Sequence, residues 1–378
     1  MKSEIYVIVH QPLSYYTFDR FGLNQNLNNK ITYLNILPLI DFKTFQSYEN
    51  SNFRNDNFLN FKSYSSLLDF LMKNKNNFFY INLTGKNLTS TLIEIFFSLY
   101  GGVKFEIIQP SLPLLSKQKK NLKRIFNTSK ILLYYKFRNK IKDTLQSFLY
   151  LLICKKPKIS FVSNNIDFDK LNKSKLTFKI NHLDYYNFHK DNKKDKNQEY
   201  FCFVDQEQEN SFENKLYFKK PYIPGYLARI SKLLKTIENK TGLSAKIALH
   251  HRKKSIPKEF ENFHCLSNNT IEIIKNSKFI LSHNSTALNF AIMSKKPIIL
   301  IWLEEFNSRL SKYSTMKKLE YEIDCRIINE KDNLDDIDFQ KKIDDFKYNK
   351  FIENYINFNE KISLEHPWKT IDIELSRL

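Results

Sequence analysis

Short apolar runs alternate with amphipathic stretches along the whole chain. The runs predict strands in two series, at 5–9, 31–37, 78–83, 104–108 and 159–163 and then at 200–204, 246–249, 279–281 and 297–302. Apolar positions at helical spacing between them predict helices, among others at 64–72, 92–100, 226–240, 270–276 and 288–293. Strands that alternate with helices favour a parallel sheet covered on both faces. The sequence therefore predicts an α/β fold class.

A polar stretch without apolar residues, 190–198, separates the two series of strands. A chain of 378 residues is long enough for two domains of ordinary size, each with its own core. We therefore predict two doubly wound, Rossmann-like domains, 1–190 and 199–378, that face each other across a cleft. Ligands of such sheets bind beyond the carboxyl ends of the strands. The residues that follow each predicted strand are the candidates for chemistry.

The turn after the predicted strand 279–281 carries the strongest local signal. It reads Ser-His-Asn-Ser-Thr from 282 to 286, and a predicted helix follows directly. A helix N-terminus offers backbone N–H groups and a positive dipole end to a phosphate, and the hydroxyl groups of Ser285 and Thr286 can add donors. Ser285 or Thr286 could equally be an ordinary N-cap, a role that these residue types fill in many helices.

A second polar cluster begins where the second strand of the second series ends, at His250, His251 and Arg252. Arg is scarce in this chain, with nine of the 60 Lys and Arg residues, so Arg252 stands out from the composition. A guanidinium group and an imidazole ring both suit a phosphate ligand. The alternative is a solvated basic strand end, which would account for His251, Lys253 and Lys254.

Both clusters follow the carboxyl end of a predicted strand, and so does Asp205 after strand 200–204. Parallel strands lie roughly 4.8 Å apart. We expect the strands before His250 and before the 282–286 turn to be neighbours, so that both clusters reach one phosphate. The residues predicted to bind this ligand are Asp205, His250, Arg252, His283, Asn284, Ser285 and Thr286.

Composition excludes several classes of protein. Hydrophobic residues make up 42% of the chain and aromatic residues 15%, which excludes a disordered protein. With 6 Gly residues the chain has no glycine-rich phosphate loop, so a nucleotide would be held by helix N-termini and side chains. The 4 Cys residues are dispersed, as expected in a reducing compartment. No spacing of Cys or carboxylate residues indicates a metal site.

The net charge of +20 favours anionic partners, although the Lys-rich, Asn-rich composition typical of an AT-rich genome accounts for part of it. Residues 117–156 mix Lys with apolar residues at helical spacing, which suits an interfacial helix on anionic lipid or, equally, an amphipathic helix with a solvated face. No run reaches the roughly 20 apolar residues of a membrane span. We expect a cytoplasmic protein in peripheral contact with the inner face of the membrane. No sequence signature indicates a specific nucleic-acid partner.

The order of these motifs, from Phe201-Cys-Phe-Val-Asp-Gln206 through His250-x-Arg252 to His283-x-Ser-Thr-Ala287, resembles the C-terminal half of GT-B glycosyltransferases. The resemblance is to those of bacterial surface-polysaccharide clusters, of the capsule and sialyltransferase-like type, and covers about 200–305. In that family a His-Pro motif and a Ser-Ser/Thr motif bind the phosphate and ribose of a CMP-sugar. His250 matches the His, Ser285 and Thr286 match the pair, and His251 stands where the family has Pro.

The resemblance implies a transferase, of hexosyl or sialyl/nonulosonate type, that moves a sugar from a nucleotide-sugar donor such as a CMP-sugar to a surface glycan or lipid-linked acceptor. Domain 199–378 would bind the donor, and domain 1–190 would lie on the acceptor side, with helical residues 339–359 crossing back to it. Neither metal nor cofactor is expected, so the helix N-terminus, His250 and Arg252 would stabilise the leaving phosphate.

The general base should come from the first domain, whose corresponding sheet edge holds His10, Asp19, Arg20 and Thr84. His10 and Asp19 are the catalytic candidates by position. The alternative enzyme is a nucleotide-sugar epimerase of GT-B architecture. A basic nucleic-acid-binding protein is a third interpretation, which depends on the net charge alone.

Overall fold

The computed structural model describes most of the chain. The described residues are 4–10, 20, 22, 25, 27–49, 56–74, 78–84, 88–109, 154, 156–171, 176–190, 199–209, 223, 225–250, 253, 255–267, 269–303, 310–357 and 364–378.

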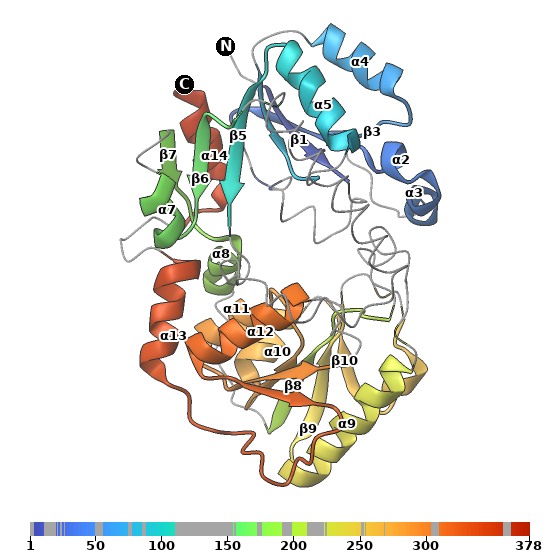
Figure 1. The fold of residues 1–378 in the computed structure, drawn as a ribbon, viewed down its shortest axis with the longest axis vertical. Coiled ribbons are helices and arrows are strands. Elements are labelled where there is room, and N and C mark those ends of the chain that lie inside the picture. Colours follow the sequence, from blue (N-terminus) through green and yellow to red (C-terminus); the bar gives the residue numbers. More distant parts are fainter. Residues whose placement is uncertain are drawn as a thin grey trace, which may run out of the picture.

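The first sheet has seven parallel strands in the order β3-β2-β1-β4-β5-β6-β7 (Figure 1). They are β1 (Glu4–Val9), β2 (Lys30–Asn35), β3 (Phe58–Asn60), β4 (Phe78–Asn82), β5 (Val103–Ile108), β6 (Ile159–Val162) and β7 (Leu176–Lys179). The helices of this part are α2 (Leu37–Ile40), α3 (Phe42–Glu49), α4 (Tyr64–Lys73), α5 (Leu88–Leu99), α7 (Asn165–Leu171) and α8 (Leu183–Lys190). Residues 5–9 of β1 are fully or almost fully buried, as expected for a central strand covered on both faces.

The second sheet has six parallel strands in the order β10-β9-β8-β11-β12-β13. They are β8 (Tyr200–Val204), β9 (Ser244–Ala248), β10 (His264–Leu266), β11 (Ile280–Ser282), β12 (Ile298–Trp302) and β13 (Arg326–Asn329). Its helices are α9 (Tyr226–Thr241), the 3-10 helix η3 (Lys258–Phe260), α10 (Thr270–Asn276), α11 (Leu288–Met293), α12 (Leu310–Ile323), α13 (Asp345–Phe351) and the π-helix η5 (Ile352–Ile356). The predicted α/β class with two Rossmann-like sheets is confirmed.

The predicted strands correspond to the buried strands of both sheets. The four strands that the sequence did not predict are β3, β7, β10 and β13, and each is the outermost strand of its sheet. They are three or four residues long and mostly half-exposed. A short strand with one solvated side has no continuous apolar run, which was the criterion for predicting a strand.

The last helix, α14 (Pro367–Ser376), packs against the first sheet. Figure 1 shows it in red beside β5 and β6, whereas the preceding helix α13 lies with the second sheet. Trp368, Ile371 and Leu375 join the core cluster that contains Ile5 of β1. Residues 191–198, where we placed the domain boundary, lie outside the described residues, so the boundary stays a prediction.

Asp372 fixes α14 to the segment before β2. Its side chain is 2% exposed and accepts the backbone N–H of Asn28 at 2.6 Å and that of Asn29 at 2.9 Å. The amide Nδ2 of Asn29 also donates to Asp372 Oδ1 at 2.8 Å. One buried carboxylate therefore satisfies three donors from a segment about 340 residues away.

We expect Asp372→Ala to lower the free energy of unfolding of the first domain by about 1–3 kcal/mol, because buried N–H groups lose their acceptor. The midpoint of urea unfolding measures this effect. Asp345→Ala removes a carboxylate from the exposed pair with Lys295 and is the control; it should change the midpoint far less. Equal shifts in the two variants would contradict the role of Asp372.

Candidate functional site

The strand order of each sheet reverses at one point, between β1 and β4 and between β8 and β11. In doubly wound sheets the ligand crevice lies outside the carboxyl ends of the strands at such a point. In the second sheet Asp205 and Gln206 follow β8, and His283 and Asn284 follow β11. The backbone N–H of Asn284 donates to Gln206 Oε1 at 3.2 Å, so the two segments are in direct contact.

Asp205 lies at the centre of this edge with a fully buried carboxylate. Its Oδ1 accepts the N–H of Glu207 at 3.1 Å, and its Oδ2 accepts the N–H of His250 at 3.2 Å. Its own N–H donates to the carbonyl of Ala248 at 3.0 Å. Asp205 therefore joins the loop after β8 to the loop after β9.

The alternative of a solvated basic strand end is wrong for Lys253, which is buried. Its side chain is 7% exposed, and Nζ lies 2.8 Å from Asp205 Oδ2 and 2.7 Å from Glu209 Oε1. Nζ also lies 5.3 Å from the centre of the Phe260 ring. Burial lowers the pKa of Lys253, but Asp205 and Glu209 outweigh it and the pKa is raised, so the ammonium group stays charged.

His250 is partly exposed at this edge, with 23% of its side chain accessible. Its Nδ1 lies 3.5 Å from Oε2 of Glu207, whose backbone is in the left-handed region at φ 50°. Left-handed backbone is uncommon outside glycine and often marks a functional site. The expectation that the strands before His250 and before the 282–286 turn are neighbours was wrong, because β8 lies between β9 and β11.

The turn before α11 is closed by its own hydrogen bonds. Ser285 Oγ accepts the N–H of Ala287 at 3.2 Å, and the three amides that follow donate to the carbonyls of 285–287. The helix itself has six residues. Within the described part of the chain, the amides of Ser285 and Thr286 have no acceptor, so these two N–H groups remain for a ligand. Ser285 is half-buried and Thr286 is exposed.

His283 lies in the core, with no exposed surface. Its Nδ1 is 2.7 Å from the carbonyl oxygen of Ile301, which can only accept, so Nδ1 carries the proton of the neutral ring. Its Nε2 therefore accepts the hydroxyl proton of Tyr226 at 3.0 Å. Burial, together with the charges of Asp205 and Glu209, raises the pKa of Tyr226 far above its usual value, so the hydroxyl stays protonated. Both ring nitrogens of His283 are therefore hydrogen-bonded within the core, which anchors the start of the turn.

In the first sheet, His10 after β1 and Thr84 after β4 flank the switch point. His10 is 9% exposed. Thr84 is buried and donates its N–H and its hydroxyl to Asn82 Oδ1, at 3.0 and 2.6 Å. Asn82 in turn donates to Glu94, which forms a buried ion pair with Lys104. Thr84 and Glu94 are thus committed to a network inside the domain.

Four of the predicted features lie outside the described residues, wholly or almost so. They are Asp19, His251, Arg252 and the basic segment 117–156, of which Cys154 and Lys156 are described. Arg20 is described and exposed, and its carbonyl oxygen accepts the indole N–H of Trp368 at 3.2 Å.

Helix α8, which follows β7, contacts the second domain. Asp184 Oδ2 accepts Nδ2 of Asn289, in the first turn of α11, at 2.7 Å. The carbonyl oxygen of Phe188 accepts Nζ of Lys275, on α10, at 3.0 Å. The segment after β7 of the first sheet is therefore bonded to the segment after β11 of the second.

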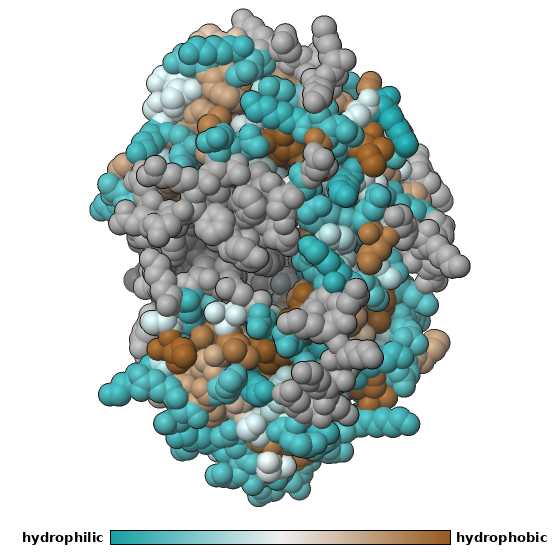
Figure 2. All heavy atoms as spheres, turned by 180° about the vertical axis from the view of Figure 1, so that it is seen from behind, coloured by the Kyte–Doolittle hydropathy of each residue, from teal (hydrophilic) through white to brown (hydrophobic). Residues whose placement is uncertain are grey.

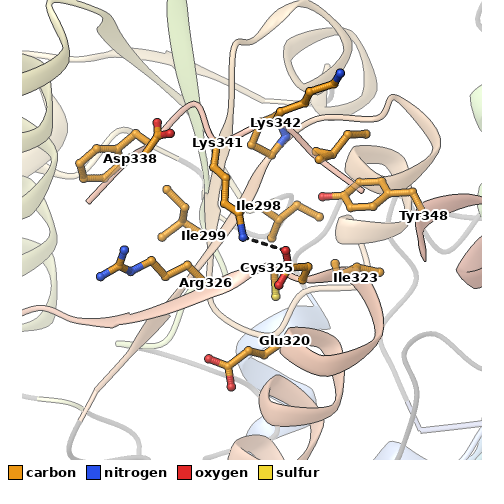
Figure 3. A pocket seen from close by; sticks show the side chains of 14 residues that line it. Ile298, Ile299, Glu320, Ile323, Cys325, Arg326, Asp338, Lys341, Lys342 and Tyr348 are labelled. Atoms are coloured by element: carbon orange, nitrogen blue, oxygen red, sulfur yellow. Dashed lines mark hydrogen bonds and ion pairs between the residues drawn. The ribbon is translucent and has the colours of Figure 1, made fainter. Parts of the chain in front are cut away.

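A cavity of about 250 Å³ lies at the opposite edge of the second sheet, at the amino ends of β12 and β13 (Figure 3). Ile298, Ile299 and Tyr348 line it, and the ion pair between Lys341 and Asp324, at 2.7 Å, lies across it. Its place at the amino edge separates it from the candidate site, because ligands of doubly wound sheets bind at the carboxyl edge.

In the part of the chain that the structure describes, no helix is long and apolar enough to cross a bilayer. Figure 2 shows that the described surface seen from behind is largely hydrophilic, with small apolar areas between the polar side chains. Among the same residues, no group of three His, Cys, Asp or Glu side chains could hold a metal ion.

No family model matches the chain, and no curated protein matches it. Solved structures do. A UDP-bound MnaA from S. aureus is 12% identical, with 100% of this chain and 98% of that chain covered and a TM-score of 0.48. A UDP-GlcNAc 2-epimerase from Methanocaldococcus jannaschii is 14% identical, with coverage of 99% and 100% and a TM-score of 0.46. MurG from Acinetobacter baumannii is 8% identical, with coverage of 87% and 86% and a TM-score of 0.43. Likenesses at this level concern the fold, and no residue role is carried over from them.

We expect Tyr226→Phe and His283→Ala each to lower the free energy of unfolding of the second domain by about 1–3 kcal/mol. Each substitution leaves a buried polar group without its hydrogen-bond partner. His250→Ala should leave the free energy of unfolding nearly unchanged, since the ring is partly exposed. Thermal midpoints of the three variants test this difference. A loss of stability in His250→Ala as large as in His283→Ala would contradict the view that His283 stabilises the core while His250 does not.

Proposed function

We propose that the chain is a metal-independent glycosyltransferase that uses a nucleotide-sugar donor. The observation that carries the proposal is the convergence of Asp205, His250 and the 285–286 amides at the carboxyl edge of the second sheet, around its switch point. Ligands of doubly wound sheets bind at such a point, which supports a nucleotide site there. The chain supplies N–H and imidazole donors at that place, which suit phosphate oxygens.

The donor would lie across the end of β8. His250 follows β9 and Ser285 follows β11, so two strand spacings, roughly 10 Å, separate their strands. A nucleotide of phosphate, ribose and base is long enough to contact both segments at once. We assign the leaving phosphate to the amides of Ser285 and Thr286, with Ser285 Oγ and Thr286 Oγ1 beside them, and a second part of the nucleotide to His250.

During transfer the bond from the anomeric carbon of the sugar to the leaving phosphate oxygen breaks, and negative charge grows on that oxygen. Preorganised N–H donors stabilise such charge without a metal. The acceptor hydroxyl attacks the anomeric carbon and loses its proton to a general base. We assign this base to the switch point of the first sheet, to His10, with Asp19 as the second candidate by position.

The finer assignments are also part of the proposal. The His250 and Ser285-Thr286 motifs support a CMP-linked donor, with a sialyl or nonulosonate sugar. The acceptor would be a surface glycan or a lipid-linked sugar, presented on the cytoplasmic side of the membrane. The basic composition of 117–156 supports contact with anionic lipid there.

A nucleotide-sugar epimerase would use the same nucleotide site and differs in needing no acceptor. Two assays separate the enzymes. In the first, the protein is incubated with UDP-GlcNAc alone, and proton NMR detects a new sugar isomer only if it is an epimerase. In the second, CMP-linked and UDP-linked sugars are supplied with a mixture of lipid-linked and free glycan acceptors, and mass spectrometry detects the extended acceptor.

We expect one of CMP, CDP, UDP, GDP and dTDP to raise the melting temperature of the protein, since a ligand that binds the folded state stabilises it by mass action. Ser285→Ala with Thr286→Ala should weaken binding of that nucleotide by about 1–3 kcal/mol, because a charged phosphate loses hydroxyl donors. Calorimetric titration measures the loss.

Ser294→Ala is the control for the double variant, because Ser294 caps the opposite end of α11. It should bind the nucleotide like the parent. If no nucleotide shifts the melting temperature, the proposed donor site is wrong. If the double variant binds as tightly as the parent, the hydroxyl groups serve the turn alone.

A further inference from the structure

Asp205, Lys253 and Glu209 form a buried ion-pair cluster at the carboxyl edge of the second sheet. Lys253 is the cation of this cluster, between Asp205 and Glu209, and its side chain is 7% exposed. Burying an ammonium group and two carboxylates costs several kcal/mol of desolvation for each ion. Well-packed apolar residues of similar volume are often as stable, so stability alone is a weak reason for such a cluster.

The contacts of the cluster converge on the backbone of His250. Asp205 Oδ2 accepts the N–H of His250 at 3.2 Å and lies 2.8 Å from Lys253 Nζ. The backbone N–H of Lys253 donates to the carbonyl oxygen of His250 at 2.9 Å. Both peptide groups that flank the His250 Cα are therefore held, one by Asp205 and one by Lys253.

The imidazole ring of His250 is connected to the same cluster through Glu207. Glu207 Oε2 lies 3.5 Å from His250 Nδ1, and the N–H of Glu207 donates to Asp205 Oδ1. Because Nδ1 faces Glu207, the other ring nitrogen, Nε2, points away from Glu207. Lys253 thus fixes Asp205, and Asp205 fixes both the backbone of His250 and the residue that orients its ring.

We propose that Lys253 is a positioning residue of the nucleotide site, whose ammonium group locks the loop after β9 so that the His250 imidazole is presented to the bound nucleotide. This inference rests on the proposed function. Lys253 does not touch the ligand, because its ammonium group is enclosed by Asp205, Glu209 and the Phe260 ring.

A double-mutant cycle on the full chain tests the inference, with UDP and CMP as the probes. We expect Lys253→Met to weaken binding roughly tenfold, like His250→Ala, the usual effect of losing one hydrogen bond to a charged group. The double variant should bind no more weakly than His250→Ala alone, since Lys253 acts through His250. A role in stability alone would lower the affinity equally in both backgrounds.

Glu209→Gln is the second variant, for the case that Lys253→Met does not fold. This substitution weakens the ion pair of Lys253 with Glu209 but leaves its pair with Asp205. We expect the affinity for the nucleotide to fall a few-fold, roughly a third of the Lys253→Met effect on a logarithmic scale. In the His250→Ala background this loss should again disappear. Lys278→Met is the matched control. Lys278 lies 2.8 Å from Glu199 at the amino end of β8, and its loss should leave the affinity unchanged.

The outcomes separate this inference from the proposed function. If the parent binds neither UDP nor CMP, nor another nucleotide of the panel, the proposed donor site fails and Lys253 with it. If the parent binds but the losses from Lys253→Met and His250→Ala add, the nucleotide site stands and the positioning role is overturned. Parent-like binding by Lys253→Met overturns it as well.

Discussion

Every strand pairing described in the two sheets is parallel, and this constraint decides where polar residues can meet. All carboxyl ends of a parallel sheet lie at one edge, and the central strands are the most deeply buried. A residue that follows a central strand is therefore brought beside residues that are remote in the sequence. Gln206 and Asn284 are 78 positions apart and share a hydrogen bond. Strand order therefore determines which residues can meet at the candidate site.

The same edge shows what charge costs in a protein interior. Asp205 is fully buried, and its carboxylate is tolerated because three donors surround it, two backbone amides and the ammonium group of Lys253. This carboxylate joins the loop after β8 to the loop after β9. The partly exposed groups of this edge lie at its periphery, in the ring of His250, which is 3.5 Å from Glu207, and in the turn at Ser285 and Thr286. Buried residues hold the site, and partly exposed ones form it.

The sequence predicted the buried strands, because burial on both faces requires apolar runs, and it missed β3, β7, β10 and β13, which need none. It also predicted which turns carry polar residues. It could not predict that Lys253 is buried, since burial of a Lys depends on carboxylates supplied by another loop. His283 posed the reverse problem. Its place in a polar turn indicated a ligand contact, while its partners, Tyr226 and Ile301, lie on elements that only the fold brings near.

Hydrogen bonds of α7 and α8 join described segments of the two parts of the molecule. Asn165 Nδ2 donates to the carbonyl oxygen of Glu353, and Asn289 Nδ2 donates to Asp184. Figure 1 shows α8 between the two sheets, with α7 above and α13 below on the left of the view. The chain passes from the first sheet to the second after α8 and returns to the first sheet with α14. Helix α8 follows β7 and α11 follows β11, so the bond between Asp184 and Asn289 ties the carboxyl edge of the first sheet to that of the second.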